Sequence, residues 1–382
     1  MIIIIGGGVM GCSTAYHLAK AGIPATVLEM DAIGAKASGK AAGFLDSLVV
    51  SVFYSCFTQG NAEDSVRQQF AQVADAGFKM FPAIVDDIRE RTEIDVQYQT
   101  GIQLRCAMSQ KEEETLLSVS KQVRQLTGIE VEIISGDESR RIEPLLSPRV
   151  RLAVKLPYAR VEPYRYTLGL AEVAEQMGIE IVLHQATAFR FSSETGLVHE
   201  VQAGSRWLPC EALVVAAGPW SDAILWQLGI SYQSRMVRGQ MLRLTCPTVP
   251  QNYVVYNPEV DGMVCDMLVF PCADGSLLAG YTGDTDGVTA DSDNPTARSR
   301  QVISECLADF VPVLANASIV EHRAAVLANP PQGGLVLGRA PGWQNVYLAL
   351  VGDGGIGVSP LTGQSIARLI QDDIVGRRDV GA

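Results

Sequence analysis

The chain has 382 residues, 47% hydrophobic and 19% charged, a composition typical of a globular protein of about two domains. Its net charge of −12 argues against a nucleic-acid-binding surface, because such surfaces gather Lys and Arg. No stretch reaches the roughly 20 apolar residues of a membrane-spanning helix, and no basic segment precedes the first apolar run, so we expect a cytoplasmic protein without a signal peptide. Four histidines and eight scattered cysteines without a CxxC pair predict no metal site and no disulfides.

The first 29 residues carry the strongest motif. Residues 2–5 are four isoleucines, which predict a buried strand of a parallel sheet. A GxGxxG motif follows and leads into a helix predicted over residues 10–21, and residues 25–28 predict a second strand that ends at Glu29. In such a unit the glycines let the backbone approach a pyrophosphate, and the acid accepts hydrogen bonds from a ribose diol. The motif predicts a dinucleotide site made by Gly6, Gly8, Val9, Met10, Gly11 and Glu29.

A run of small residues, ASGKAAG at 37–43, follows this unit. It has too little bulk to form core, so we expect a loop that lies against a flat or charged group. A flexible surface loop is the alternative. The cofactor-binding residues expected here are Ser38, Gly39, Lys40, Ala41, Ala42 and Gly43.

The next part of the chain alternates between helix and strand. Residues 61–92 predict a helix, which Pro82 should break or kink. Residues 179–183 follow a helix that ends at glycine, as residues 25–28 do, which predicts a return to the first sheet. The other elements expected are strands at 96–107, 131–134 and 153–161, helices at 111–127, 137–142 and 163–177, and a small antiparallel ribbon over 189–213.

A second apolar strand, residues 213–218, closes on glycine before a short helix. In a doubly wound sheet such a turn meets the other side of the cofactor, which predicts contacts from Ala217, Gly218 and Trp220. Residues 231–285 change in character and contain alternating strands separated by Gly and Pro. This pattern predicts an antiparallel sheet in a second domain.

The tail carries a second glycine-rich turn. Residues 346–351 predict a buried strand, and Ser359 and Pro360 predict the N-cap and first position of a final helix. Glycines between them bring backbone N–H groups to one place, which suits partial negative charge on a ligand. The predicted binding residues are Gly352, Gly354, Gly355, Ile356 and Gly357.

Five motifs together resemble the FAD-dependent amine oxidoreductases, the relatives of glycine oxidase, sarcosine oxidase and D-amino-acid dehydrogenases. They occur in the family's order and span essentially the whole chain. The motifs are residues 6–29, ASGKAAG at 37–43, VRGQ at 237–240, FPCADGSLLAGYT at 270–282 and GDGGIGVSPLTGQ at 352–364.

The resemblance implies a Rossmann-like FAD-binding domain of α/β class and an α+β substrate domain with an antiparallel sheet. It also implies FAD, and no cysteine follows Arg323 in the sequence, which predicts non-covalent binding. The expected FAD-binding domain is discontinuous. It comprises residues 1–80, 145–228 and 325–382, and the substrate domain comprises residues 81–144 and 229–324.

The family oxidises the carbon–nitrogen bond of a small amino acid or N-substituted amino acid to an imine, which water hydrolyses. Arg323 matches the arginine that binds the substrate carboxylate, and its planar guanidinium suits that role. The family's assisting tyrosine is Leu268 here, and Tyr256 or Tyr281 would have to compensate. His322 beside the arginine is a candidate base, although a structural role is the simpler interpretation.

The electron acceptor stays open. No lysine follows Lys155, so the oxygen-activating lysine of sarcosine oxidases is missing, which favours a dehydrogenase with a separate electron acceptor. Lys36 and Lys40 are expected near the flavin and could take that lysine's place, so an oxidase is the alternative. An alternative is a flavoprotein subunit that needs a partner chain, with residues 48–57 as its apolar contact surface, although burial of that segment is the simpler interpretation. A nicotinamide dehydrogenase would have a contiguous first domain, which the late return of sheet-like segments contradicts.

Overall fold

The computed structural model describes residues 1–58, 64–260 and 263–380. One of its two larger sheets has six strands and contains the parallel strands predicted at the amino terminus. Its central strands are parallel, and β18 is an antiparallel edge strand beside β19. The order is β18 (Leu335–Arg339), β19 (Val346–Val351), β11 (Ala212–Val215), β1 (Ile2–Ile5), β2 (Ala25–Leu28) and β7 (Glu180–Val182). The predicted return of the chain at β7, β11 and β19 is confirmed.

Alternate isoleucines of β1 face opposite layers, as the period of a strand requires. Ile2 and Ile4 belong to the core formed with the helices on one side, and Ile3 and Ile5 to the core on the other. Burial on both sides explains the unbroken apolar run. The helical layer contains α1 (Val9–Lys20), α4 (Asp64–Arg91), α7 (Pro163–Gln176) and α10 (Gly355–Val380); the other layer contains the ribbon β8 (Ala186–Ser192), β9 (Leu197–Ala203) and β10 (Arg206–Pro209), with η1 (Gly218–Trp220) and α8 (Ser221–Gln227).

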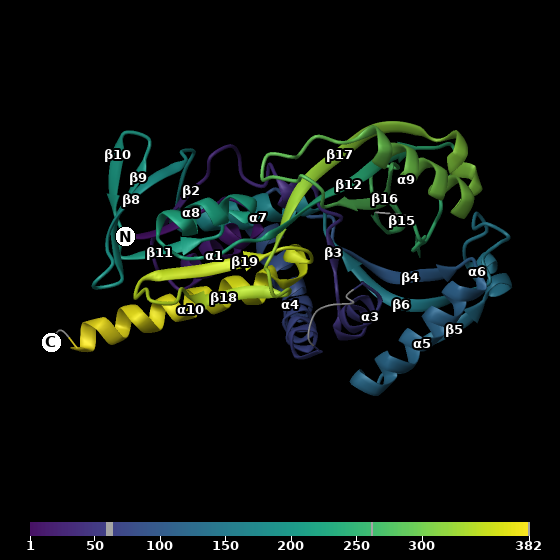
Figure 1. Cartoon of the computed structure of the whole chain (residues 1–382), viewed down its shortest axis with the longest axis horizontal. Helices are drawn as coiled ribbons and strands as arrows, with labels where there is room; N and C mark the ends of the chain where they lie inside the picture. Colours follow the sequence, from purple (N-terminus) through teal and green to yellow (C-terminus); the bar gives the residue numbers. More distant parts are fainter. Residues whose placement is uncertain (59–63, 261–262, 381–382) are drawn as a thin grey trace.

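The ten-stranded sheet forms the other half of the molecule, and β12 and β17 extend from it toward the six-stranded half (Figure 1). Most of its neighbouring strands are antiparallel, although β4 and β13 run parallel. Its path is β17 (Ser318–Asn329), β12 (Arg235–Thr245), β16 (Leu277–Asp284), β15 (Met267–Pro271), β13 (Tyr253–Tyr256), β4 (Gln99–Ala107), β6 (Leu152–Arg160) and β3 (Phe44–Leu45), with β14 (Val264–Cys265) beside β16 and β5 (Glu132–Ser135) beside β6.

Helices cover parts of this sheet. One core lies between the sheet and α9, and a second lies between α3, α5 and strands β4 and β6. Val49, Val50 and Phe53 of α3 are buried in that second core, so this part of the apolar segment 48–57 contributes to the interior. The side chains of residues 55–57 lie outside the described part of the chain. The helices are α2 (Ala37–Lys40), α3 (Leu48–Thr58), α5 (Gln110–Thr127), α6 (Gly136–Ile142) and α9 (Ala297–Phe310), with η2 (Pro312–Asn316).

Two helix boundaries differ from the sequence predictions. Pro82 does not end α4, which runs continuously from Asp64 to Arg91, and Phe81 and Ile84 near it are buried in the core. Residues 61–63 of the predicted helix lie outside the described residues. The last helix begins at Gly355, before the predicted cap. Ser359 lies inside it, and its hydroxyl donates to Ile356 O at 2.8 Å.

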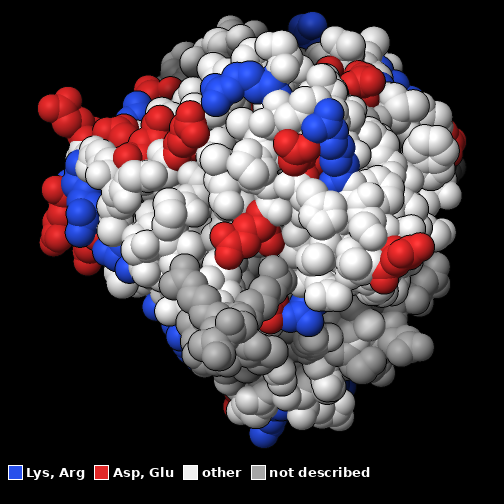
Figure 2. Space-filling model, turned by 90° about the vertical axis from the view of Figure 1, so that its left-hand side faces the viewer, with Lys and Arg blue, Asp and Glu red and all other residues white. Residues whose placement is uncertain are grey.

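Charged side chains on the face in Figure 2 are of both signs and interspersed among uncharged residues, so the coloured part of this face forms no continuous basic patch. Within the described ranges, no helix has the length and hydrophobicity needed to cross a membrane.

Candidate functional site

The turn between β1 and α1 requires glycine at two of its three motif positions. Gly6 has φ +111°, and a Cβ there would lie 2.4 Å from Ala216 O. A Cβ on Gly11 would lie 1.9 Å from Gly6 O. At Gly8 a Cβ would meet only Ser38 Oγ, at 3.1 Å. Gly6 and Gly11 therefore hold the turn together, and Gly8 keeps space open beside the helix N-terminus.

The N-terminus of α1 suits an anionic group. Gly8 is its N-cap and provides no side-chain hydrogen bond, and the first turn contains no acidic residue. The N–H of Val9 donates to Ser38 Oγ at 2.9 Å, which brings the small-residue loop against this helix end. The helix dipole, with the N–H groups of the first turn, favours phosphate at such a position.

Glu29 lies at the end of β2, beside the glycine turn. Its carboxylate accepts hydrogen bonds from Gly7 N at 2.6 Å and from Asp31 N at 2.8 Å, so backbone groups fix its orientation. Each carboxylate oxygen has capacity for a further donor. The arrangement fits an adenosine ribose hydroxyl at this carboxylate.

Residues 37–43 were predicted as a loop, but residues 37–40 form the short helix α2. Two strands of the ten-stranded sheet hold this segment, for which we keep the name small-residue loop. Lys40 Nζ donates to Ala324 O of β17 at 2.9 Å. Arg160 Nε, at the end of β6, donates to Ala42 O at 2.7 Å. Ser38 contacts α1, so the loop links the dinucleotide motif to the substrate sheet.

The turn after β11 contacts the segment that connects β16 to α9. Ala217 is the N-cap of η1, Trp220 ends it, and Trp220 Nε1 donates to Asp291 Oδ1 at 3.3 Å. Lys36 Nζ is 6.0 Å from the Trp220 ring centre and 3.5 Å from Asp293 Oδ2. Of the three predicted residues in this turn, Trp220 thus lies near Lys36, at the start of the small-residue loop.

The glycine turn before α10 is closely packed. A Cβ on Gly352 would lie 1.9 Å from Asn329 Oδ1, which accepts a hydrogen bond from Asp353 N at 3.1 Å. Gly354 has φ +75°. A Cβ on Gly357 would lie 3.7 Å from Asp46 N, so the first turn of α10 adjoins the chain just after the small-residue loop.

Three structural features show that the predicted cofactor-binding residues are compatible with FAD. The N-terminus of α1 is open to a phosphate, Glu29 is oriented at the ribose position, and the small-residue loop continues to a second helix N-terminus at α10 with no acidic residue in its first turn. Segments far apart in sequence meet along this path, as the discontinuous cofactor site requires.

The ten-stranded sheet presents one of its faces to the small-residue loop. Its apolar side chains there pack against Ala42 and Phe44, and we call this the loop-facing side. Phe44 stacks on Tyr253 with ring centres 4.4 Å apart. The loop-facing side consists of Met241, Tyr253, Val255, Leu268, Phe270 and Leu278.

The predicted substrate residues do not all share this side. Arg323 pairs with Met241 across β17 and β12, and directly opposed residues point to the same face, so Arg323 is on the loop-facing side. Tyr281 packs there too. Tyr256 belongs to the opposite core, and its hydroxyl donates to Glu112 Oε1 at 3.0 Å. The position of Tyr256 does not support the predicted role in substrate binding, which stays a prediction.

Arg323 has no hydrogen bond or ion pair with the residues that the structure describes, and its Nε is fully enclosed. Burial lowers the pKa of the Arg323 guanidinium, with Arg243 adding to the decrease and Glu321 opposing it. His322 pairs with Leu242 and therefore points to the opposite side. Its position favours the structural interpretation over that of a base beside Arg323.

Sequence reasoning missed Asp46, which follows β3 and adjoins α10. Water reaches part of this side chain, but protein atoms surround it densely, and burial raises the pKa of Asp46 to about 7. Asp353 adds to the rise, and Arg105 opposes it. Arg105 is fully buried and donates to Asn257 Oδ1 at 2.5 Å. The only sequence signal for Asp46 was an acid directly after a small-residue loop.

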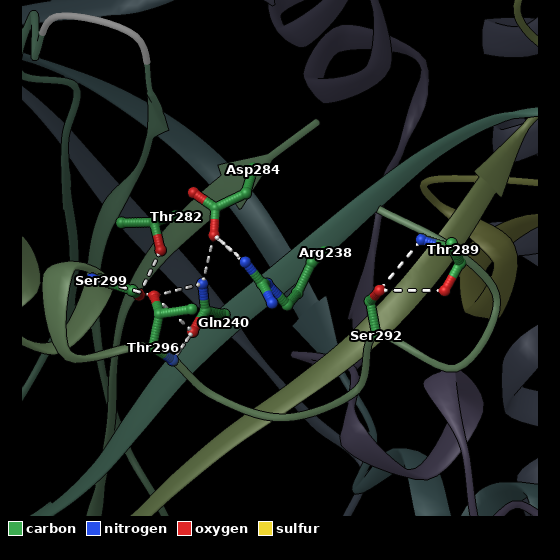
Figure 3. Close-up of polar contacts among 8 residues, drawn as sticks. All are labelled: Arg238, Gln240, Thr282, Asp284, Thr289, Ser292, Thr296 and Ser299. Atoms are coloured by element: carbon green, nitrogen blue, oxygen red, sulfur yellow. Dashed lines mark hydrogen bonds and ion pairs between the residues drawn. The ribbon is translucent and has the colours of Figure 1, made fainter. Parts of the chain in front are cut away.

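The VRGQ motif anchors the segment between β16 and α9 (Figure 3). Arg238 Nη2 lies 3.1 Å from Asp284 Oδ2, to which Gln240 Nε2 also donates at 2.8 Å. Gln240 Oε1 accepts from the N–H of Thr296, the N-cap of α9, at 2.7 Å. These contacts fix both ends of the segment. Between its ends, the segment contacts Trp220, Lys36 and Lys40.

Comparison with known proteins identifies the family to which the chain belongs. A model of the FAD dependent oxidoreductase family matches residues 1–369. Glycine oxidase from Bacillus licheniformis is 26% identical over 375 residues, covering 96% of this chain and 92% of the relative. Crystal structures of glycine oxidase from Bacillus cereus (TM-score 0.84, 23% identity, 97% and 94% coverage) and of iminodiacetate oxidase from a Chelativorans species (TM-score 0.80, 22% identity, 97% and 95% coverage) have the same fold.

Proposed function

The chain belongs to the family of FAD-dependent oxidoreductases, and we propose that it oxidises the carbon–nitrogen bond of a small amino acid or N-substituted amino acid. The product is the imine, which water hydrolyses to a carbonyl compound and an amine or ammonia. A cytoplasmic location, as the sequence predicts, suits such a substrate. The relatives named as glycine oxidases support this substrate class.

One observation carries the proposal. Arg323 places a guanidinium without a carboxylate partner among the described residues on the loop-facing side, next to the loop that is expected at the flavin. A half-buried cation of this kind is costly unless a ligand neutralises it, and its planar fork matches a carboxylate. A carboxylated amine supplies that partner.

The remaining residues position the substrate. Apolar side chains of the loop-facing side, with Tyr281, exclude water from the amine. FAD supplies the electron-accepting chemistry when bound. Asp46 and Asp353 lie toward the α10 end of the site, where burial raises the pKa of both carboxyls and favours their neutral forms. Arg323 orients the acid group of the substrate.

A dehydrogenase is favoured over an oxidase. Lys36 and Lys40 are the candidate oxygen-activating lysines near the site, and both lie within ion-pair distance of Asp293, at 3.5 and 3.8 Å. Lys40 is further held by Ala324 O. Lysine side chains held in these contacts are poorly placed to activate oxygen for reaction with the reduced flavin.

The test is a turnover assay on the purified yellow protein with an artificial electron acceptor or with air. D-amino acids and N-methyl amino acids are screened for formation of a 2-oxo acid and release of ammonia or methylamine. We expect product with the acceptor, and much slower product with air alone. Fast release of hydrogen peroxide in air would make the protein an oxidase, and no product from any carboxylated amine would reject the proposed function.

A further inference from the structure

Arg160 is a second guanidinium at the same site. It lies at the end of β6, is 3% exposed, and its guanidinium carbon is 4.6 Å from the ring centre of Phe270 on the loop-facing side. Its Nε donates to Ala42 O. Among the described residues no carboxylate lies within ion-pair distance of this side chain. A nearly fully buried arginine without a counter-charge is rare, because removing the charge from water is costly.

Strand register places Arg160 and Arg323 on the same side of the ten-stranded sheet. Phe270, on which Arg160 stacks, pairs with Leu278, and Leu278 pairs with Arg243 of β12. Met241, two residues before Arg243 and on the same side of the strand, pairs with Arg323. Both guanidiniums therefore lie over adjacent rows of the loop-facing side. Burial lowers the pKa of Arg160, Cys272 and Glu162 oppose this decrease, and Arg323 and Arg243 add to it.

Nearby acids do not neutralise this pair. Arg243 has its own partners, with Asp274 Oδ2 at 3.4 Å from Nη2 and Ser276 Oγ at 2.9 Å from Nε. Glu162 and Glu321 lie near enough to act on Arg323 electrostatically, but neither forms an ion pair with it in the described structure. Glu162 is engaged as the N-cap of α7, where it accepts from Arg165 N at 2.8 Å.

We propose that Arg160 and Arg323 form one dianion-binding subsite, so that the preferred ligand is an amine with two carboxylates. An acidic amino acid or an amine with two carboxylate arms has this chemistry. A monocarboxylate would neutralise one guanidinium and leave the other buried and repelled, whereas two carboxylates neutralise both and satisfy their N–H donors. The identity of the amine rests on the proposed function, but the binding of a dianion does not.

Binding of unreactive acids tests the subsite without turnover. The protein with bound FAD is titrated with succinate and with butyrate, which have the same carbon count, at constant ionic strength. Binding is followed by the flavin absorbance change and by the melting temperature. We expect succinate to bind at least about tenfold more tightly than butyrate. Equal affinities in the wild-type protein would overturn the proposal.

Variants assign the preference to the two arginines. Arg160→Gln and Arg323→Gln should each reduce the succinate preference to about twofold or less, Arg160→Lys should retain part of it, and Arg190→Gln on the exposed ribbon should leave it unchanged. Arg323 has no hydrogen bond to lose among the described residues, so its variant serves if Arg160→Gln fails to fold. A preference unchanged in both Gln variants would overturn the assignment.

The outcomes separate this subsite from the proposed function. A succinate preference in a protein that oxidises no carboxylated amine would reject the function and keep the subsite. Oxidation of monocarboxylic amines without any preference for dicarboxylates would keep the function and reject the subsite.

Discussion

Lys40 donates a hydrogen bond from Nζ to the backbone oxygen of Ala324 at 2.9 Å, which joins the small-residue loop to the residue beside Arg323. Asp293 lies 3.8 Å from Lys40 and 3.5 Å from Lys36, and Asp291 accepts from Trp220. The segment between β16 and α9 therefore contacts both the turn after β11, through Trp220, and the small-residue loop, through Lys40.

We expect Asp293→Asn to release FAD several-fold faster than the wild-type protein. The substitution removes two ion pairs that hold this segment against the small-residue loop, and partly exposed pairs of this kind contribute about 0.2–1 kcal/mol each. FAD release is measured by fluorescence after dilution. Asp286→Asn on the same segment is the control, and equal release rates for the two variants would show that the segment does not retain the cofactor.

Substitutions in the glycine turn should separate binding from folding. Gly8→Val is expected to yield a folded but colourless protein, because a side chain there meets only Ser38 Oγ and otherwise occupies space beside the helix N-terminus. Gly11→Ala should instead destabilise the fold, since its Cβ would approach Gly6 O to 1.9 Å. Circular dichroism and flavin absorbance distinguish these effects. A Gly8→Val protein that stays yellow would exclude the turn from the FAD site.

Removal of the Arg323 guanidinium should weaken binding of a carboxylated amine. We expect Arg323→Ala to raise KM by about two orders of magnitude or more, equivalent to roughly 3 kcal/mol for a charge-assisted hydrogen-bonded pair. Arg190→Ala, whose ion pair with Glu200 lies on the ribbon, is the control. Steady-state kinetics with both variants check this, and an unchanged KM would remove Arg323 from the substrate site.

Asp46 should make stability depend on pH. Burial raises its folded-state pKa to about 7, above the ordinary value of 3.8, so the unfolded chain loses this proton first as pH rises. The wild-type protein therefore loses stability between about pH 4 and 7 through this group, and Asp46→Asn does not. We expect the melting temperature of the variant relative to the wild-type protein to increase from pH 5 to pH 8. A difference independent of pH would show that Asp46 titrates normally.

Local pattern predicted much of the fold. The apolar run at residues 2–5 predicted a doubly buried strand, and the strand pairs of β1 with β2 and β11 confirm it. The start of α10 could not be predicted in this way, because Ser359 and Pro360 are favourable at a helix start, and tertiary packing of Gly355 and Ile356 extends the helix before them.

The site depends on features that a single sequence does not contain. Tyr256 and Tyr281 both lie on strands, and only the pairing register decides which side of the sheet each faces. Arg160 at the end of β6 gave no local signal, since its role depends on a Phe270 that lies 110 residues later in the chain. Local sequence motifs were therefore enough to predict the cofactor-binding residues. The substrate-binding residues could be predicted only in part, because their positions depend on how distant strands pair.

The most direct measurement of the central claim is anaerobic mixing of the purified yellow protein with a carboxylated amine. The proposed function predicts loss of the flavin absorbance near 450 nm with such an amine, and little loss with the corresponding amine that lacks a carboxylate, since Arg323 then has no partner. A full screen of carboxylated amines that leaves the flavin oxidised would contradict it, as would equal bleaching by the amines without a carboxylate.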